Sequence, residues 1–351
     1  MSIGSGVGET IRQLVIANET SSYPWHFRVF VQKSFSPQDV PSGLSNSIFT
    51  RLRGKYLLPI IQAWQVSKRR HADYIVATDF RMFIIALFAW ALRLRSPSKV
   101  TFWLHGIPLV IEGRVRLWIF RIASIASPLV FVSEAVRNAH EYPLHRGNRK
   151  VVLNGVQDHG FRARSIGAQK PFVLQYTAAF VGWKNHRTLL HAVAKVINAG
   201  ETIHLRLLGE GQIKSEMERL ADELGIAPFV HFMGRRRDAR ELLQECDLYV
   251  HPSIGEALGI AVVEAMFAGM PIITANSGAF PEYLDHDSTA LLVNCEDGGQ
   301  ALSDALLEML QRIEDGRAIE MGKSAFLEAN KRFGTSRYIE EWKAAVDLGN
   351  R

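Results

Sequence analysis

The chain has 351 residues, of which 47% are hydrophobic, enough for two domains of ordinary size, and this excludes a disordered or fibrous protein. Its net charge of +6 is unevenly divided: residues 1–150 contain 20 Lys and Arg against 8 Asp and Glu, and residues 151–351 contain 21 against 27. A basic first half predicts an anionic partner, such as an acidic substrate or the surface of a membrane.

Nothing in the sequence predicts a membrane span or export. The longest uncharged apolar runs, 82–92 and 122–133, are shorter than the roughly 20 residues that cross a bilayer. Glu9 and Arg12 stand where a secretory signal needs an unbroken apolar stretch. We therefore expect a cytoplasmic protein. Basic and aromatic residues alternate over 114–121, which suits either an amphipathic helix peripheral on the inner face of the membrane or a solvated helix.

The N-terminal half alternates loosely between short apolar runs and helical stretches. Residues 33–50 are rich in Ser, Pro, Gly and Asn and are predicted to be a loop or a mobile segment, and 154–169 has the composition of a linker. No nucleic-acid motif accompanies the basic charge, so nucleic acid is not an expected partner. The predicted strands are 14–17, 29–32, 74–77, 100–104, 128–132 and 150–153.

The C-terminal half alternates more regularly, which is typical of a parallel sheet wrapped by helices and predicts an α/β fold. Cys246 and Cys295 are too few for a disulfide framework or a zinc site and are expected to be buried thiols. The predicted strands are 172–177, 204–208, 230–233, 248–251, 271–274 and 290–293, and the predicted helices are 187–198, 213–224, 239–245 and 260–268.

Two acids interrupt the otherwise small and apolar segment GEALGIAVVEAMFAGMPII, residues 255–273. Glu256 falls in the loop after strand 248–251, and Glu264 falls in the first turns of the next helix, where α/β sheets bind ligands. A helix N-terminus binds phosphate, and a carboxylate accepts hydrogen bonds from adjacent sugar hydroxyls. The pair predicts a nucleotide-sugar site; the alternative is a capping acid and a surface acid without a ligand.

The segment resembles the E-x7-E motif of retaining glycosyltransferases of family four. HPSIGEALGIAVVEAMFAGMPIITANSGAFPE is similar to that family's series of motifs in order and spacing, and the likeness runs from about His105 to the C-terminus. Further resembling elements are Leu104-His105-Gly106, Asn154-Gly155-Val156, Lys184-Asn185-His186, Leu207-Leu208-Gly209-Glu210-Gly211 and Phe232-Met233-Gly234.

The resemblance implies the GT-B architecture, two facing Rossmann-like domains with a cleft between them. The N-terminal, acceptor-binding domain would span 1–155 and the linker 156–169. The C-terminal domain, which would bind the nucleotide sugar, would span 170–330. Residues 331–351 would form a helix that returns to the N-terminal domain.

The resemblance also implies roles for individual residues. Glu264 would bind the nucleotide ribose, Glu256 would lie beside the transferred sugar, and Lys184 would neutralise the leaving diphosphate. The expected catalytic residues are therefore His105, which would lie near the sugar and acceptor, Lys184 and Glu256. The expected donor-binding residues are Gly209, Arg235, Leu258, Gly259 and Glu264, with the backbone N–H groups of Leu258 and Gly259 completing the phosphate seat.

The sequence departs from the family pattern before the basic loop. A glycine and an arginine are usual at two positions that are Ala178 and Ala179 here, so one diphosphate contact is missing. Arg187, or one of the three arginines 235–237, is the candidate substitute. The motif Asp285-His286-Asp287 mimics a metal-binding D-x-D, but it falls in the turn expected before strand 290–293. We therefore expect neither a metal nor a cofactor, with the nucleotide sugar as substrate.

These observations predict a retaining hexosyltransferase that moves a hexose or N-acetylhexosamine from a nucleotide diphosphate sugar to a glycan or lipid-linked acceptor, as in cell-surface polysaccharide synthesis. Two alternatives stay open. The departures at Ala178 and Ala179 suit a GT-B scaffold that has lost catalysis, and the same architecture suits a nucleotide-sugar epimerase or phosphorylase.

Overall fold

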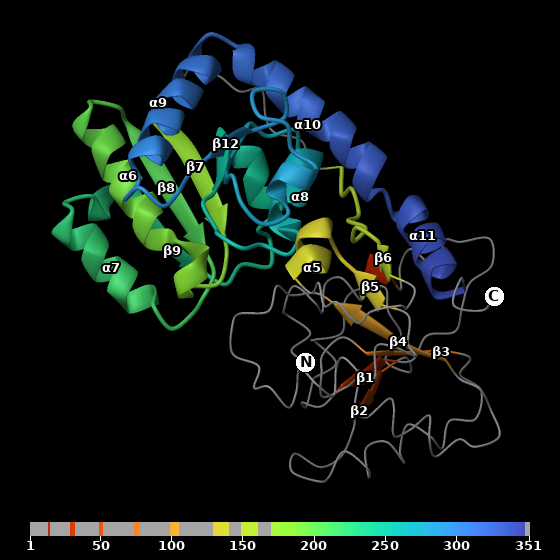
Figure 1. Ribbon diagram of the computed structural model, residues 1–351. Coiled ribbons are helices and arrows are strands. Elements are labelled where there is room, and N and C mark those ends of the chain that lie inside the picture. Colours follow the sequence, from red (N-terminus) through yellow and green to blue (C-terminus); the bar gives the residue numbers. More distant parts are fainter. Residues whose placement is uncertain are drawn as a thin grey trace. The chain divides into compact units, whose positions relative to one another are not determined.

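The computed structural model describes residues 13–14, 29–31, 49–51, 74–77, 99–104, 129–139, 149–160 and 170–347 (Figure 1). The chain divides into two compact units, residues 1–157 with 335–351, and residues 158–334. Each unit is built around a parallel sheet and is considered by itself below.

The N-terminal unit contains a four-stranded sheet in the order β3 (Tyr74–Ala77), β4 (Lys99–Leu104), β5 (Leu129–Phe131) and β6 (Arg149–Val151), all parallel. A separate parallel pair joins β1 (Val29–Val31) to β2 (Phe49–Arg51), and α5 (Glu134–Ala139) follows β5. Five of the predicted strands are confirmed to within two residues.

Two predictions for the N-terminal half are wrong. Phe49 and Thr50, the last residues of the predicted loop or mobile segment 33–50, belong to β2, because a strand of three residues is too short to show alternation. Residues 33–48 lie outside the described residues. Gln13 and Leu14 are helical, although Leu14 was expected to begin a strand, because a short apolar run fits either element.

Helix α11 (Thr335–Asp347) supplies part of the core of the N-terminal unit. Trp103 of β4 meets Trp342 edge-on with ring centroids 5.6 Å apart, and Tyr338 lies 6.4 Å from the same ring. Gly155 packs against Tyr338 so closely that a Cβ atom there would lie 2.5 Å from its ring. The Asn-Gly-Val element therefore has a packing role in this unit.

The C-terminal unit contains a six-stranded parallel sheet in the order β12-β11-β10-β7-β8-β9. The sheet reverses its winding between β7 and β10, the position at which α/β sheets bind ligands. The strands are β7 (Phe172–Thr177), β8 (Ile203–Leu208), β9 (Val230–Gly234), β10 (Leu248–His251), β11 (Ile272–Ala275) and β12 (Leu291–Val293).

Helices cover this sheet, and all of the predicted strands of the C-terminal half are confirmed to within a residue. Helix α6 packs against α7 and α9, and α8 packs against α10, β10 and β11. The predicted helix 239–245 is instead the short 3-10 helix η5 (Glu241–Glu245). The longer helices are α6 (His186–Asn198), α7 (Lys214–Glu223), α8 (Ile260–Phe267), α9 (Gln300–Glu314) and α10 (Arg317–Phe333).

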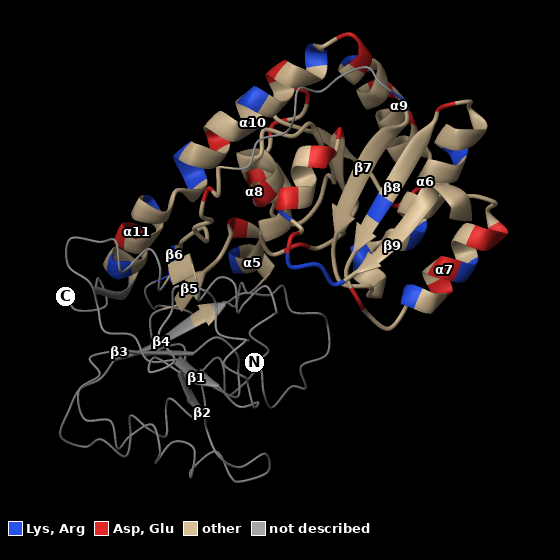
Figure 2. Cartoon of the chain, turned by 180° about the vertical axis from the view of Figure 1, so that it is seen from behind, with Lys and Arg blue, Asp and Glu red and all other residues tan. Residues whose placement is uncertain are grey.

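Most charged residues of the C-terminal unit lie on its outside, and Asp247 and Glu256 are buried exceptions. Figure 2 shows residues of both signs along α7 and α10, whereas β7 carries none. Leu174, Tyr176, Leu205, Leu207 and Val250 are almost completely buried in the sheet. Burial of each such side chain stabilises the fold by about 1.5–3 kcal/mol, and the packed sheet holds the loops at its carboxyl edge in place.

Candidate functional site

A polar cluster lies at the carboxyl edge of the C-terminal sheet, where the loop after β7 meets the loop after β10. Lys184 ends the 3-10 helix η3 (Gly182–Lys184), and its Nζ forms an ion pair with Oε1 of Glu256. His251, the last residue of β10, places Nε2 2.9 Å from the same oxygen. The side chains of Lys184 and Glu256 are 14% and 8% exposed, so the pair is largely screened from water.

Burial and pairing oppose each other in this cluster. Burial alone would raise the pKa of Glu256, but its hydrogen bonds and electrostatic interactions with His251 and Lys184 outweigh burial and lower that pKa to about 2. Burial lowers the pKa of Lys184, and Glu256 offsets part of this shift. Burial also lowers the pKa of His251. The cluster therefore holds an ionised carboxylate, an ammonium and a neutral imidazole.

Backbone contacts clamp the two loops together around the ion pair. Asn185 adopts a left-handed backbone with φ 58°, and its Nδ2 donates to the carbonyl oxygens of Pro252 and Cys295. The Trp183 carbonyl accepts a hydrogen bond of 3.0 Å from the Ile254 N–H. Tyr176 of β7 donates from its hydroxyl to the Lys184 carbonyl over 2.7 Å. The backbone of Lys184 is thus held in place by the sheet beneath it.

The backbone of Glu256 is held from a third direction by Gly278. A Cβ atom at this glycine would lie 2.6 Å from the Glu256 nitrogen, and the residue has φ 58°, so both space and conformation require glycine. The next N–H, that of Ala279, donates to the Glu256 carbonyl over 3.0 Å. The sequence predicted Glu256 at the site, and the structure shows that Gly278 must be small to pack against the Glu256 backbone.

Glu264 lies in α8 and pairs with Arg240, a residue that the sequence analysis did not single out. Arg240 donates from Nε and Nη2 to Oε1 of Glu264, over 2.7 and 2.6 Å. The two residues are 24 positions apart. No periodic pattern connects them, and only the sheet order brings them together.

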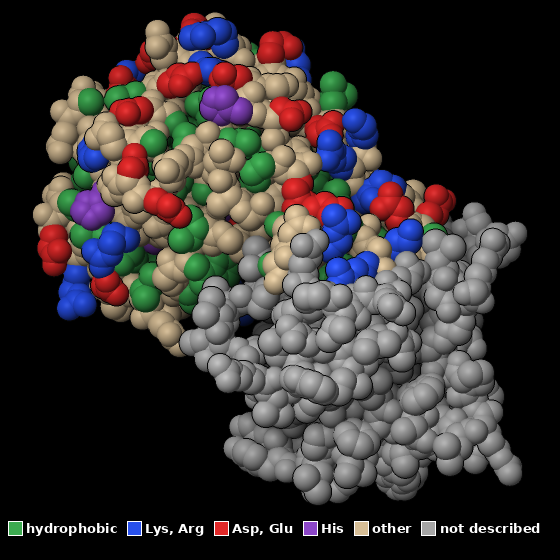
Figure 3. Space-filling view, viewed as in Figure 1, with side chains coloured by type: hydrophobic (Ala, Val, Ile, Leu, Met, Phe, Trp, Pro, Cys, Tyr) green, Lys and Arg blue, Asp and Glu red, His purple; other side chains and the backbone are tan. Residues whose placement is uncertain are grey.

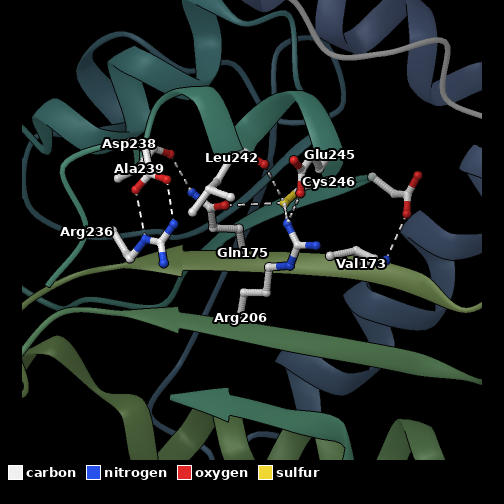
Figure 4. A network of polar contacts seen from close by, with 10 residues as sticks. Val173, Gln175, Arg206, Arg236, Asp238, Ala239, Leu242, Glu245 and Cys246 are labelled. Carbon is white, nitrogen blue, oxygen red and sulfur yellow. Dashed lines mark hydrogen bonds and ion pairs between the residues drawn. The ribbon is translucent and has the colours of Figure 1, made fainter. Parts of the chain in front are cut away.

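A buried amide secures the segment that carries Arg240. Gln175 of β7 donates from Nε2 to the carbonyl of Ala239 over 3.0 Å and accepts from the Cys246 thiol over 3.3 Å (Figure 4).

Both predicted buried thiols are confirmed, because Cys246 and Cys295 are free and buried, and burial raises the pKa of each to about 12.

The loop before α8 is where the sequence predicts the phosphate seat, and close packing shapes it. Gly259 has φ 80°, and a Cβ atom there would lie 2.6 Å from the Phe280 ring. The buried Leu258 accepts a hydrogen bond of 2.6 Å from the Tyr283 hydroxyl at its carbonyl. Within the described part of the chain, the N–H groups of Leu258 and Gly259 make no hydrogen bond. Such groups at a helix N-terminus attract anions.

Gly209 is the first residue after β8, in the glycine turn, and it packs closely against the backbone of Ala178. It has φ 148°, and a Cβ atom there would lie 1.9 Å from the Ala178 carbonyl oxygen. Its N–H donates to the Gly234 carbonyl over 2.8 Å. The glycine therefore lets the loops after β7, β8 and β9 approach one another at the edge of the sheet.

The arginines weighed as substitutes at Ala179 lie in exposed positions. Arg235 is exposed, Arg236 pairs with Asp238, and Arg187 pairs with Glu216. His105, the expected catalytic histidine, lies outside the described residues.

The motif 285–287 forms the expected turn. Asp287 pairs with Arg312 over 2.7 Å, and His286 accepts a hydrogen bond from the Leu292 N–H. The described residues contain no group of three or more His, Cys, Asp or Glu side chains arranged to hold a metal ion. Among the described helices, none has the length and hydropathy to cross a membrane.

Known glycosyltransferases resemble the part of the chain that contains this site. Residues 171–312 match the family model described as glycosyl transferases group 1. The chain is 32% identical over 160 residues to D-inositol 3-phosphate glycosyltransferase of Corynebacterium kroppenstedtii, which covers 42% of this chain and 35% of that protein. It is also 32% identical over 154 residues to the lipopolysaccharide core biosynthesis glycosyltransferase LpsD of Rhizobium meliloti, with 44% and 42% covered. The chain therefore spans less than half the length of either relative.

Solved structures resemble the chain over a larger part of its length. Anabaena Alr3699/HepE, solved in complex with UDP and glucose, matches with a TM-score of 0.73 and 21% identity over 86% of this chain and 85% of that one. This likeness establishes the GT-B fold, as the sequence predicts.

Proposed function

Because residues 171–312 match the group 1 glycosyl transferases and the chain has the GT-B fold, we propose that it transfers a sugar from a nucleoside diphosphate sugar to an acceptor. The sugar is a hexose or N-acetylhexosamine, and the acceptor is a glycan or a lipid-linked molecule. The products would serve cell-surface polysaccharide synthesis, in keeping with the lipopolysaccharide role in the name of one relative.

The ion pair of Lys184 with Glu256 at the carboxyl edge of the sheet carries this proposal. Breaking a glycosyl phosphate bond leaves negative charge on the diphosphate, and a cation and backbone N–H groups at the site stabilise that charge. Lys184 supplies the cation, and the N–H groups of Leu258 and Gly259 form the phosphate seat. Glu264, held by Arg240, accepts hydrogen bonds from the ribose, and Glu256 lies beside the sugar.

We further propose that the reaction retains the configuration of the sugar and uses no metal or cofactor. Lys184 and the N-terminus of α8 neutralise the charge of the leaving diphosphate. Proton NMR of the sugar released by slow donor hydrolysis tests retention, because the first anomer formed matches the donor. Release of the opposite anomer contradicts it.

The proposal includes the membrane surface as a partner. The C-terminal unit carries charges of both signs interspersed over the face shown in Figure 3, so it has no single-sign surface there. The excess positive charge of the chain belongs to residues 1–150, and anionic lipid attracts such basic segments. The acceptor, if lipid-linked, would then be reached at the inner face of the membrane.

Turnover tests the proposal directly. The purified protein is incubated with UDP- and GDP-sugars and a lipid extract, and release of the nucleoside diphosphate is followed. We expect release from one donor class, and a loss of about 100-fold in Lys184→Met, the size of effect that removal of one charge-stabilising group produces. Nucleotide binding without any turnover would favour the alternative, a GT-B scaffold, which the exposed Ala179 in place of a cation suggests.

A further inference from the structure

Glu256 receives two donors on one oxygen. Lys184 Nζ and His251 Nε2 both contact Oε1, and His251 does so over 2.9 Å. Within the described part of the chain, no hydrogen bond reaches Oε2. The carboxylate is therefore anchored through Oε1, and its second oxygen remains available to a ligand.

The proton on His251 has a defined place. An ionised carboxylate only accepts, so Nε2 of the ring carries the hydrogen that faces Glu256. The other nitrogen, Nδ1, lies 3.3 Å from the Tyr249 hydroxyl, which donates to it. The ring is 2% exposed and is packed edge-on to Tyr176 and Phe280 at centroid distances of 5.0 and 5.3 Å. It has no room to turn away from Glu256.

The two donors have different freedom to move. Lys184 has a flexible stem, and a diphosphate that enters the seat attracts its ammonium group away from Glu256. A buried carboxylate that is left without any partner takes up a proton, because burial disfavours its charged form. His251 cannot follow the diphosphate, so its N–H remains on Oε1 when the ammonium leaves.

No other cation near the pair can replace Lys184 in the described part of the chain. The ionisable groups that interact with His251 or Glu256 are held neutral, since burial lowers the pKa of His186 to about 3 and raises the pKa of each phenol. These groups, besides Lys184, are His186, Tyr176, Tyr249 and Tyr283.

We propose that His251 is a positioning residue. It keeps Glu256 ionised and oriented while the ammonium group of Lys184 moves from Glu256 to the diphosphate of a bound nucleotide. The inference rests on the proposed function, because it requires a nucleoside diphosphate in the seat. His251 then remains hydrogen-bonded to Glu256 while Lys184 exchanges its ion pair with Glu256 for one with the diphosphate.

Proton linkage tests this proposal. Calorimetric titrations with UDP and with GDP at pH 6.5, repeated in buffers of different ionisation enthalpy, give the protons taken up per nucleotide bound. His251→Leu is expected to take up about one proton more than the wild type, because a buried glutamic acid without a partner has a pKa as high as about 8–9. It is also expected to bind about tenfold more weakly, the cost of one charge-assisted hydrogen bond.

The double variant with His251→Leu and Glu256→Gln has no carboxyl to protonate, so the additional uptake should disappear. Should His251→Leu not fold, as judged by circular dichroism, His251→Asn serves in its place, because its amide is too short to reach Oε1. Equal proton uptake in the wild type and in the folded single variant overturns the inference while the proposed function stands. A wild type that binds neither nucleotide overturns the proposed function, and the inference with it.

Discussion

The guanidinium of Arg240 donates from both Nε and Nη2 to a single carboxylate oxygen of Glu264, over 2.7 and 2.6 Å. Arg240 immediately precedes η5, Glu264 lies in α8, and both side chains are mostly buried. Because the planar guanidinium donates twice to the same oxygen, it holds the Glu264 carboxylate in one orientation. The Glu264 carboxylate, which is expected to bind the ribose, is therefore preorganised to accept hydrogen bonds.

Arg240→Ala tests the importance of this alignment. We expect the affinity for the nucleoside diphosphate to fall about tenfold, because a buried charge-assisted hydrogen bond contributes roughly 1.5 kcal/mol or more. Arg317→Ala is the matched control, since Arg317 pairs with Asp315 on the surface, where the two side chains are 61% and 40% exposed. Calorimetry should show unchanged binding in the control, and equal affinities in all three proteins would contradict the role of Arg240.

Gly209→Ala is expected to destabilise the C-terminal unit by about 3 kcal/mol, since overpacking and a strained backbone act together. The added Cβ atom would lie 1.9 Å from the Ala178 carbonyl oxygen, and φ is 148°. Gly182→Ala is the control, because no atom lies within 4 Å of the corresponding position there. The unfolding midpoint in urea should fall for the first variant alone; similar midpoints would show that the turn yields at little cost.

Glu256 makes stability depend on pH in a defined window. Its pKa in the folded chain, about 2, lies below the ordinary value of 4.5, so the unfolded chain binds the proton more tightly. The contribution, about 3 kcal/mol, is present above pH 4.5 and is lost as the pH falls toward 2.

Unfolding midpoints at pH 7, 4.5 and 3 check this window. Wild type should lose stability on acidification more steeply than Glu256→Gln, which has no proton to take up there. The exposed Glu320, paired with Lys323, provides the control Glu320→Gln, whose curve should run parallel to that of the wild type. A Glu256→Gln curve with the same slope as the wild type would refute the assignment.

The basic first half predicts binding to anionic vesicles that weakens with salt. We expect the full chain to sediment with vesicles rich in phosphatidylserine at low ionic strength and to be released as the salt approaches about 0.5 M, because screening shortens the range of surface charges. Vesicles of phosphatidylcholine alone are the control. Absence of binding at low salt would remove the membrane from the account.

The sequence predicted the elements whose hydrophobic pattern is complete. Strands 172–177 and 248–251 agree with the structure at both ends, because a buried parallel strand reads as a continuous apolar run. The family resemblance assigned Lys184 and Glu256 to the same site, although 72 residues separate them in the sequence.

Contacts that depend on the order of the strands escaped prediction. Arg240 and His251 were not singled out, because nothing local marks an arginine whose partner is in another helix, or a strand-end histidine as the donor to a loop carboxylate. The 3-10 helix η5 was expected as an α-helix, since a span of five residues does not reveal its pitch. Tertiary packing decided each of these cases.

Calorimetric titration with UDP and GDP, without added metal, tests the central claim most directly, in the wild type, Lys184→Met and Glu264→Ala. The account predicts that the wild type binds one of the two nucleotides. It also predicts that each substitution weakens this binding at least about tenfold, since each removes a charged contact to the ligand. Equal affinity in all three proteins, or no binding of either nucleotide by the wild type, would contradict the claim that this edge of the sheet is a nucleotide-sugar site.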